Sequence, residues 1–432
     1  MLSISAALGH LLETLSGDFA HSPGLQVFDV PFALNDAFDP LSWLASQSSY
    51  PQFYWQQRSG DEEAAALGAV QRFASLPLAQ QFLREHPEHP LRVWGLNAFN
   101  PQQGFLFLPR LEWRREGGHA TLRLTLLNKG SASDDLQEAK DFLASLVSTV
   151  PLPGVHQPLL AQTHTPDKPG WERLVIEATE SIARGEMEKV VLARTTDHRF
   201  YRPVNAASLM AASRRLNHHC YHFYMAFEAQ QAFLGSTPER LWRRRGNALR
   251  TEALAGTVAS HQDDREAQTL GDWLMADDKN QRENMLVVED ICQRLQRAVA
   301  SLEVLPPQIV RLRKVQHLRR CIWTELAGED DAECLSLLHP TAAVAGLPRA
   351  AARAFIDDAE PFEREWYAGS AGYLSLPQSE FCVALRCAKI DGDNVRLYAG
   401  AGIVAGSDPA QEWQEIENKA AGLRSLFVMS HV

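Results

Sequence analysis

The chain has 432 residues, which allows up to about three domains or one large composite fold. Hydrophobic residues make up 45% of the chain and charged residues 22%, so we expect a soluble globular protein with a sizeable core. The formal net charge of −11 argues against wholesale binding to nucleic acid, because such binding needs a basic surface.

Neither a secretion signal nor a membrane span is visible in the sequence. The first residues lack a basic start followed by a long apolar core, and no stretch approaches the roughly 20 uninterrupted apolar residues of a membrane span. The six cysteines form no CxxC pair, which predicts neither a disulfide framework nor a zinc site. We therefore expect a cytoplasmic protein without nucleic-acid or membrane partners.

Residues 1–150 mix strand-like runs with helical ones and carry no recognisable reaction motif, which favours a scaffold role. The strand-like runs include "PQFYWQQR" and "TLRLTLLNK", and the helical ones "LAQQFLREH" and "QEAKDFLASLVSTV". Residues 151–170 then contain five prolines and two glycines. Because proline removes backbone donors and blocks regular structure, this stretch is predicted to be a connector before a third part, 171–432.

The third part mixes helices and strands without regular alternation. A helix is predicted from apolar residues at helical spacing: Trp171, Leu174, Val175, Ala178 and Ile182. Gly185 stands where that helix would end in a left-handed residue. Strands are predicted at "CYHFYMAF", "AFLGS", "EFCVALRCAKI" and "NVRLYAGAGIV", and long helices over 264–299 and 408–427. This order indicates an α+β fold.

Lys189 opens the apolar run "KVVLAR", which is typical of a strand covered on both faces. Burial of an ammonium group favours its neutral form, and a neutral lysine amine can act as a general base. The alternative is that the side chain reaches solvent from the end of the strand. The lysine alone does not decide between them.

Glu239 follows a strand and a rigid Ser-Thr-Pro turn in "FLGSTPERLW". A carboxyl group on a fixed turn suits a general acid, since its position matters as much as its pKa. The alternative is an exposed glutamate paired with Arg240.

Two predicted helices carry carboxylates that suit a divalent cation. Glu283 lies on the first helix, and Glu412, Glu415 and Lys419 follow one face of the second. Mg²⁺ typically takes one or two protein carboxylates and keeps water and substrate oxygens. The alternative is a solvated face with an ion pair between Glu415 and Lys419.

The glycine-rich stretch "YAGAGIVAGSDP" lets backbone N–H groups approach an anion closely. The chain has no GxxxxGK[ST] motif, so a carboxylate ligand fits better than a nucleotide phosphate. A glycine-loosened strand and turn is an equally good interpretation.

The stretch "RLRKVQHLRRCIW" is the best local case for nucleic-acid binding. Alternation around Val315 and Leu318 instead predicts a strand with a charged face, and no aromatic residues are interleaved for base stacking.

Seven blocks of the sequence, taken in order, resemble the chorismate-utilising enzymes, which include anthranilate, aminodeoxychorismate, salicylate and isochorismate synthases. The blocks are "KVVLAR", "FLGSTPERL", "TEALAGT", "ENMLVVEDI", "LHPTAAVAGLPR", "EWYAGSAGYL" and "YAGAGIV" followed by "SDP" and "EWQEIENK". The resemblance implies two large, mainly antiparallel sheets packed as a sandwich, with helices outside. Residues 1–150 would then complete the sandwich within one composite domain.

Within this family the likeness is strongest to the isochorismate synthases of menaquinone biosynthesis. The implied reaction is the Mg²⁺-dependent conversion of chorismate to isochorismate, in which water attacks C2 and the C4 hydroxyl leaves. A salicylate synthase, an isochorismate synthase of siderophore synthesis and a catalytically silent binding protein remain alternatives. An ammonia-using synthase is disfavoured, because the resemblance implies a residue other than lysine at position 189 in such enzymes.

The resemblance also assigns individual residues. Lys189 would be the proton acceptor and Glu239 the proton donor, with Mg²⁺ on Glu283 and Glu415. The enolpyruvyl carboxylate would be held by Tyr367, Arg386 and the backbone of Gly400 and Gly402. The ring site would be lined by Ala255, Gly256, Thr257 and His339.

Overall fold

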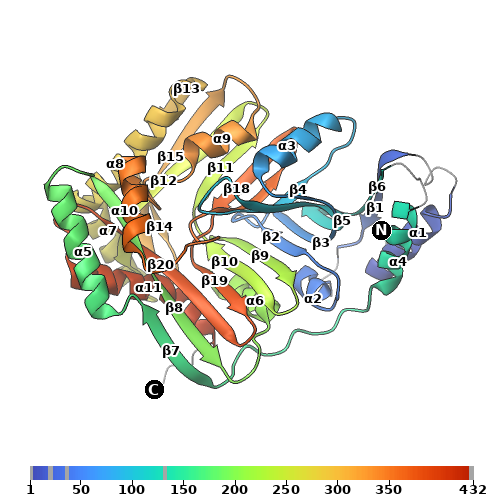
Figure 1. Cartoon of the computed structure of the whole chain (residues 1–432), viewed down its shortest axis with the longest axis horizontal. Helices are drawn as coiled ribbons and strands as arrows, with labels where there is room; N and C mark the ends of the chain where they lie inside the picture. The colour runs from blue at the N-terminus through green and yellow to red at the C-terminus, as the bar shows by residue number, and fades with distance from the viewer. Residues whose placement is uncertain (1–2, 18–22, 35–37, 130–133, 428–432) are drawn as a thin grey trace.

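A computed structural model describes residues 3–17, 23–34, 38–129 and 134–427 of the chain (Figure 1). The strands are β1 (Gly24–Phe32), β2 (Gln52–Gln56), β3 (Glu62–Phe73), β4 (Val93–Asn97), β5 (Gly104–Glu116), β6 (His119–Asn128), β7 (Leu159–Thr165), β8 (Lys189–Phe200), β9 (Tyr221–Glu228), β10 (Gln231–Thr237), β11 (Arg240–Arg245), β12 (Ala248–Ala259), β13 (Val299–Val304), β14 (Gln308–Arg311), β15 (Val315–Leu326), β16 (Gly346–Leu347), β17 (Ser370–Leu374), β18 (Gln378–Val383), β19 (Cys387–Asp391) and β20 (Asn394–Ile403). The helices are α1 (Ile4–Thr14), α2 (Pro40–Ala45), α3 (Leu76–Glu85), α4 (Asp134–Ser145), α5 (Lys168–Ala183), α6 (Ala206–Leu216), α7 (Asp264–Ala276), α8 (Asp278–Leu295), α9 (Asp331–Leu338), α10 (Arg349–Ala359) and α11 (Pro409–Phe427).

The strands form two antiparallel sheets that share one long strand. The first sheet has the order β1-β6-β5-β3-β2-β9-β10-β19-β20-β8-β7. The second has the order β4-β17-β18-β11-β12-β15, with β13 and β14 beyond β15. Strand β5 joins the two sheets, because Phe107 pairs with Trp94 of β4 whereas Leu111 pairs with Leu124 of β6. The predicted α+β fold with two mainly antiparallel sheets is confirmed.

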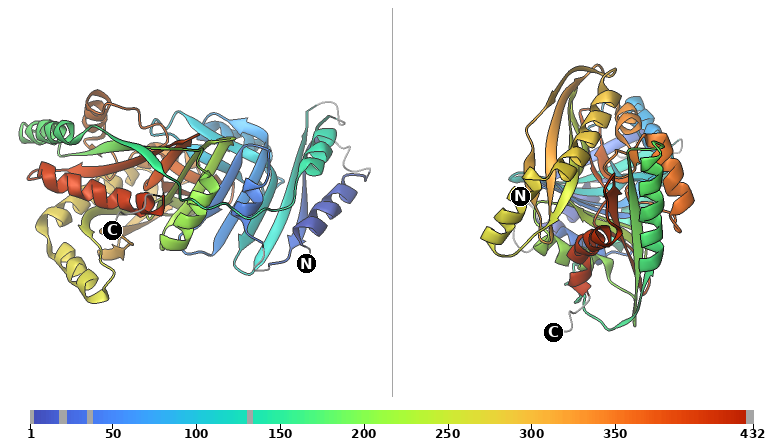
Figure 2. Two further views of the ribbon diagram at one scale, coloured as in Figure 1. Left: turned by 90° about the horizontal axis from the view of Figure 1, so that it is seen from below. Right: turned by 90° about the vertical axis from the view of Figure 1, so that its left-hand side faces the viewer.

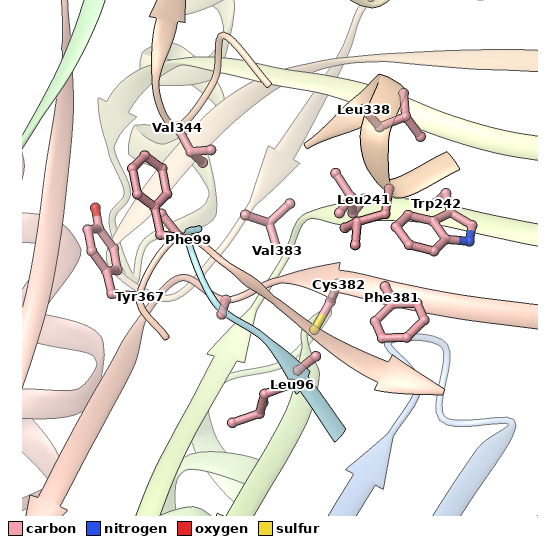
Figure 3. Close-up of a cluster of buried hydrophobic side chains, with 14 of the residues drawn as sticks. Leu96, Phe99, Leu241, Trp242, Leu338, Val344, Tyr367, Phe381, Cys382 and Val383 are labelled. Atoms are coloured by element: carbon pink, nitrogen blue, oxygen red, sulfur yellow. The ribbon is translucent and has the colours of Figure 1, made fainter. Parts of the chain in front are cut away.

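An apolar core fills the space between the sheets. The rings of Trp55 on β2 and Trp94 on β4 lie with their centroids 6.4 Å apart. Figure 3 shows the part of this core where Trp242 of β11 and Phe381 of β18 meet, with Tyr367 at its margin. Since full burial of one such side chain stabilises a protein by about 1.5–3 kcal/mol, this core fixes the strands that end at the site described below.

Helices cover the other face of the first sheet. A second buried cluster there includes Leu209 of α6, Leu234 of β10, Leu397 of β20 and Leu423 of α11. The left view of Figure 2 shows α6 and α11 lying across this face. In the described ranges, no helix is long and apolar enough to cross a membrane.

Strands from the N-terminal and C-terminal parts pair directly in both sheets. Tyr54 of β2 pairs with Tyr224 of β9 in the first sheet, and Gly95 of β4 pairs with Gly372 of β17 in the second. The two parts therefore share their hydrogen bonds and their core.

The proline-rich stretch 151–170 is more structured than predicted. It contains strand β7, which pairs with β8, and the first turn of α5. Its prolines fall where each element tolerates them, because Pro166 follows β7 and Pro169 lies in the first turn of α5 behind the N-cap Asp167. Composition alone could not show this placement.

The basic stretch, residues 311–323, spans the end of β14, a turn and most of β15, so the strand that the alternation predicted is present. Its arginines bind groups within the chain: Arg311 contacts Asp264 at 2.8 Å, Arg313 donates to Gly422 O at 2.9 Å, Arg319 donates to Gln308 at 3.1 Å, and Arg320 donates to Asn284 at 2.6 Å.

Candidate active site

Lys189, the first residue of β8, is fully buried, which overturns the alternative that its side chain reaches solvent. Its Nζ lies 3.1 Å from Glu283 Oε1 on α8. Gly402 of β20 makes this approach possible, because a Cβ there would collide with the Glu283 carboxylate and lie 2.9 Å from Lys189 Cε. We call Lys189 and Glu283 the base end of the site.

Glu239 lies in the two-residue link between β10 and β11, and only 2% of its surface is exposed. Its backbone N–H donates to the Thr237 hydroxyl at 3.3 Å. Burial, followed by the nearby Glu252 carboxylate, raises the pKa of Glu239 to about 8. The side chain therefore carries a proton at neutral pH. We call Glu239 and Glu252 the acid end.

The alternative pairing of Glu239 with Arg240 is not made. Arg240 Nε donates to the Tyr221 hydroxyl at 2.9 Å, and its Nη2 lies 3.4 Å from Glu380 Oε2. The Arg240 guanidinium is therefore bound to Tyr221 and Glu380 and forms no ion pair with Glu239.

Three glutamates of α8 and α11 act on one another electrostatically. Burial, followed by Glu415, raises the pKa of Glu412 to about 7, and Glu283 contributes in the same direction. Glu412 is paired with Lys279 at 3.2 Å, and Glu415 with Lys419 at 2.6 Å. The ion pair that the sequence offered as an alternative to a metal site is therefore present.

The described side chains do not by themselves form a complete metal site. Across the described ranges, no group of three or more His, Cys, Asp or Glu side chains is arranged to hold a metal ion. Glu283 and Glu415 are two carboxylates, a donor set that suits Mg²⁺ when water and substrate oxygens complete the shell.

One pocket brings most of the predicted residues together. It encloses about 550 Å³ of empty space, its open mouth included. Its lining contains nine of the residues assigned from the sequence: Glu239, Ala255, Gly256, Thr257, Glu283, Tyr367, Arg386, Gly400 and Gly402. Lys189 lies directly behind Glu283 and Gly402, outside the lining.

His339 and Glu415 also lie outside this lining. The ring of His339 is buried with its Nε2 2.9 Å from Phe99 O, and burial lowers its pKa to about 4. The structure therefore places His339 against the Phe99 backbone, away from the pocket wall, and Glu415 beside Lys419.

Arg386 lines the pocket and has one donor without a partner among the described residues. It lies in the bend between β18 and β19 with a φ of 47°. Its Nε is buried and has no hydrogen-bond partner among the described residues. Nearby, Gly400 permits close packing, since a Cβ there would lie 2.6 Å from the Tyr367 hydroxyl. A carboxylate would supply the acceptor that Arg386 lacks.

His317 and Lys419 line the pocket but were not assigned to it from the sequence. His317 Nε2 lies 2.7 Å from Arg386 Nη2, and its Nδ1 lies 3.1 Å from Thr257 Oγ1. Burial, followed by Arg386, keeps the pKa of His317 well below its usual value, so the neutral ring accepts from Arg386 at Nε2. Lys419 Nζ donates to Gly400 O at 2.9 Å. In the sequence, the one feature that could have drawn attention to His317 is the presence of a histidine inside the predicted charged strand.

Comparisons with known proteins agree with this geometry. A family model described as "Chorismate binding enzyme" matches residues 95–428. The chain is 68% identical over 430 residues to isochorismate synthase MenF of Escherichia coli K12, covering 99% of this chain and 100% of that one. It is 44% identical over 398 residues to isochorismate synthase MenF of Haemophilus influenzae, covering 91% and 90% of the two chains.

The solved structure of the menaquinone-specific isochorismate synthase MenF from Escherichia coli superposes on the whole chain. The TM-score is 0.96 at 68% sequence identity, and the match covers 99% of this chain and 100% of that one. The family predicted from the sequence blocks is confirmed: the chain belongs to the chorismate-binding enzymes.

Proposed function

We propose that the protein is an isochorismate synthase, which converts chorismate to isochorismate for menaquinone biosynthesis. The observation that carries the proposal is that one pocket has a buried, protonated glutamate, Glu239, in its lining and a buried lysine, Lys189, directly behind its lining residue Glu283. The two relatives that carry this activity in their names match at least nine-tenths of the chain.

In the proposed reaction, Lys189 accepts a proton from a water molecule whose oxygen attacks ring C2. The ring double bonds shift, the C4–O bond breaks, and Glu239 gives its proton to the departing hydroxyl, which leaves as water. Each side chain then holds the charge state that the reverse reaction needs, so the reverse reaction exchanges the two roles. The raised pKa of Glu239 keeps the acid loaded at neutral pH.

Arg386 and the Tyr367 hydroxyl would hold the enolpyruvyl carboxylate beside Gly400. The free Nε of Arg386 supports this role, because a guanidinium presents donors that match a carboxylate. The hydrogen bond between His317 and Arg386 fixes the direction of the guanidinium. Ala255, Gly256 and Thr257 would lie against the ring.

Glu283 and Glu415 would hold Mg²⁺ together with the ring carboxylate of the substrate. Bound there, the ion would supply positive charge that offsets the charge of the substrate anion. The chain's own part is to place the Glu283 carboxylate against Gly402, where a larger side chain would collide with it.

We propose that the protein works in the cytoplasm. All six cysteines are free thiols, four of them buried, and such usage is typical of a reducing compartment.

The test is incubation of the protein with chorismate and Mg²⁺, with and without ammonium, followed by identification of products by mass spectrometry. Isochorismate is the expected main product under both conditions. Salicylate and pyruvate as main products would instead identify a salicylate synthase, and anthranilate formed with ammonium would identify an ammonia-using enzyme. No turnover of chorismate would indicate a binding protein.

A further inference from the structure

The turn that carries Glu239 is held from outside the pocket by an arginine of the N-terminal strands. Arg58 lies in the turn between β2 and β3, and its Nη1 donates to Pro238 O at 2.8 Å. Its Nη2 forms an ion pair at 2.7 Å with Glu252 Oε1 on β12. The Arg58 guanidinium thereby contacts both Pro238, which precedes Glu239, and Glu252, whose carboxylate acts on Glu239.

Glu252 is a buried carboxylate that depends on this arginine. Only 2% of its surface is exposed, and Arg58 is its only ion-pair partner among the described residues. A buried carboxylate without a counter-charge takes up a proton, because desolvation penalises its charged form. Arg58 therefore supplies the counter-charge that this buried carboxylate needs. Neither Arg58 nor Glu252 lines the pocket.

The charge on Glu252 opposes three cations that face Glu239. Arg386, Lys189 and Lys419 each favour the ionised form of Glu239. Glu252 favours the protonated form and acts in the same direction as burial. Loss of its charge would leave the cations unopposed, and Glu239 would release its proton at a lower pH.

The arginine is presented by a braced turn. Gly60 N donates to Gln57 O at 2.8 Å, and Arg115 Nη2 donates to Gly60 O at 3.0 Å. The guanidinium carbon of Arg58 lies 5.4 Å from the centre of the Tyr221 ring, which covers it from the β9 side. The contact with Pro238 is therefore made by a pre-arranged side chain.

We propose that Arg58 and Glu252 form a positioning pair for the general acid: Arg58 fixes the turn at Pro238, beside Glu239, and pairs with the buried Glu252 carboxylate that acts on Glu239. The inference rests on the proposed role of Glu239 and deepens it. Arg58 lies outside residues 95–428, the range matched by the family model. The N-terminal strands, which carry no reaction motif, thereby take a direct part in preparing the site.

The test is the pH dependence of kcat and KM for chorismate in the full-length protein and its variants. Glu252→Gln is expected to move the alkaline fall of kcat to lower pH by about one unit, because the negative charge beside Glu239 is gone. At mildly alkaline pH this corresponds to about a tenfold lower kcat. KM should stay within about twofold, since Glu252 does not line the pocket.

Two substitutions separate the roles of Arg58. Arg58→Met should produce a shift in the same direction, because the buried Glu252 then lacks its counter-charge. It should also lower kcat at the optimal pH through loss of the Pro238 contact. Arg58→Lys should restore the pH of the alkaline fall but only part of kcat, because an ammonium keeps the charge without the fork that reaches both partners.

A matched control is Arg115→Met, which removes another brace of the same turn without touching Pro238 or Glu252. It should leave the alkaline fall in place. If single variants fail to fold, Arg58→Met combined with Glu252→Met removes both charges, which avoids an unpaired buried charge and should keep the shift.

A folded Glu252→Gln enzyme whose alkaline fall coincides with that of the wild type would overturn the proposal, as would an effect confined to KM. Failure of the proposed function gives different results. In that case the wild type makes no isochorismate, or Glu239→Gln retains full activity.

Discussion

The base end and the acid end of the pocket differ in the surroundings of their buried titratable side chains. Lys189 is fully buried but has a carboxylate partner, Glu283, at 3.1 Å. Glu239 is equally buried, but no ion-pair partner is found for it among the described residues. Burial, followed by Glu252, instead raises its pKa to about 8. The two ends therefore share deep burial and differ in whether an opposite charge contacts the buried group.

This difference indicates which of the two side chains is ready for its proposed role before any ligand binds. A general acid must hold its proton before the reaction, and Glu239 meets this condition at neutral pH without any ligand. At the base end, by contrast, Lys189 Nζ already contacts the Glu283 carboxylate at 3.1 Å. We infer that the acid end is preset by the fold, whereas the contact between Lys189 and Glu283 at the base end changes when substrate binds.

The largest effect is expected from Lys189→Ala. The substitution removes the base and leaves the Glu283 carboxylate without its counter-charge, so isochorismate formation should fall by about 10³-fold or more. Initial rates with chorismate and Mg²⁺ measure this loss. Lys389→Ala is the matched control, because it breaks a lysine–glutamate pair at 2.8 Å with Glu365 on the surface. Unchanged turnover in Lys189→Ala would show that another group is the base.

Glu239→Gln is expected to lower kcat by about 10²-fold while chorismate still binds, because glutamine keeps the shape but cannot supply the proton. The wild-type rate should fall as the pH rises through about 8, where Glu239 loses its proton, and the residual rate of Glu239→Gln should lack this fall. Rate profiles and chorismate binding by calorimetry measure both quantities. Glu325→Gln, on the exposed side of β15, is the control.

Gly402→Ala should lower kcat/KM by about tenfold or more, since a methyl group there meets the Glu283 carboxylate and Lys189 Cε. The Mg²⁺ concentration needed for half-maximal rate should rise with it. Gly118→Ala is a control without steric cost, because no atom lies within 4 Å of a Cβ at that position. Full activity in Gly402→Ala would mean that the base end has more room than the structure shows.

The smallest effect is expected on stability. Because the pKa of Glu239 is raised in the folded protein, its contribution to stability is present below the unfolded value of 4.5 and is lost as the pH rises to about 8. Glu239→Gln should therefore unfold a few degrees above the wild type at alkaline pH and at the same temperature in acid. Thermal melts across this pH range measure the gap, and a gap independent of pH would contradict the raised pKa.

Much of this arrangement could be predicted from the sequence, because local patterns determined it. The alternation around Val315 predicted a strand, Gly185 takes the left-handed conformation expected at a helix end, with a φ of 74°, and ordered blocks indicated the family. Lys189 was identified as a candidate base but not as the partner of Glu283, since 94 positions separate them in the sequence.

The remaining features depend on contacts that no local pattern encodes. Arg58 lies 180 positions before Pro238, in a region without a reaction motif. His317 contacts Arg386 across 69 positions, and a histidine within a charged strand gives no hint of that partner. His339 was assigned through its motif, and the contact of its Nε2 with Phe99 O lies 240 positions away in the sequence.

The most direct test of the central claim is the protonation state of Glu239 itself. Infrared difference spectra between the wild type and Glu239→Gln, recorded over a pH series, isolate the carbonyl stretch of this one carboxyl group. We predict the band of a protonated carboxylic acid at neutral pH, with a midpoint of loss near pH 8. A spectrum that shows only an ionised carboxylate at neutral pH would contradict the account of the acid end.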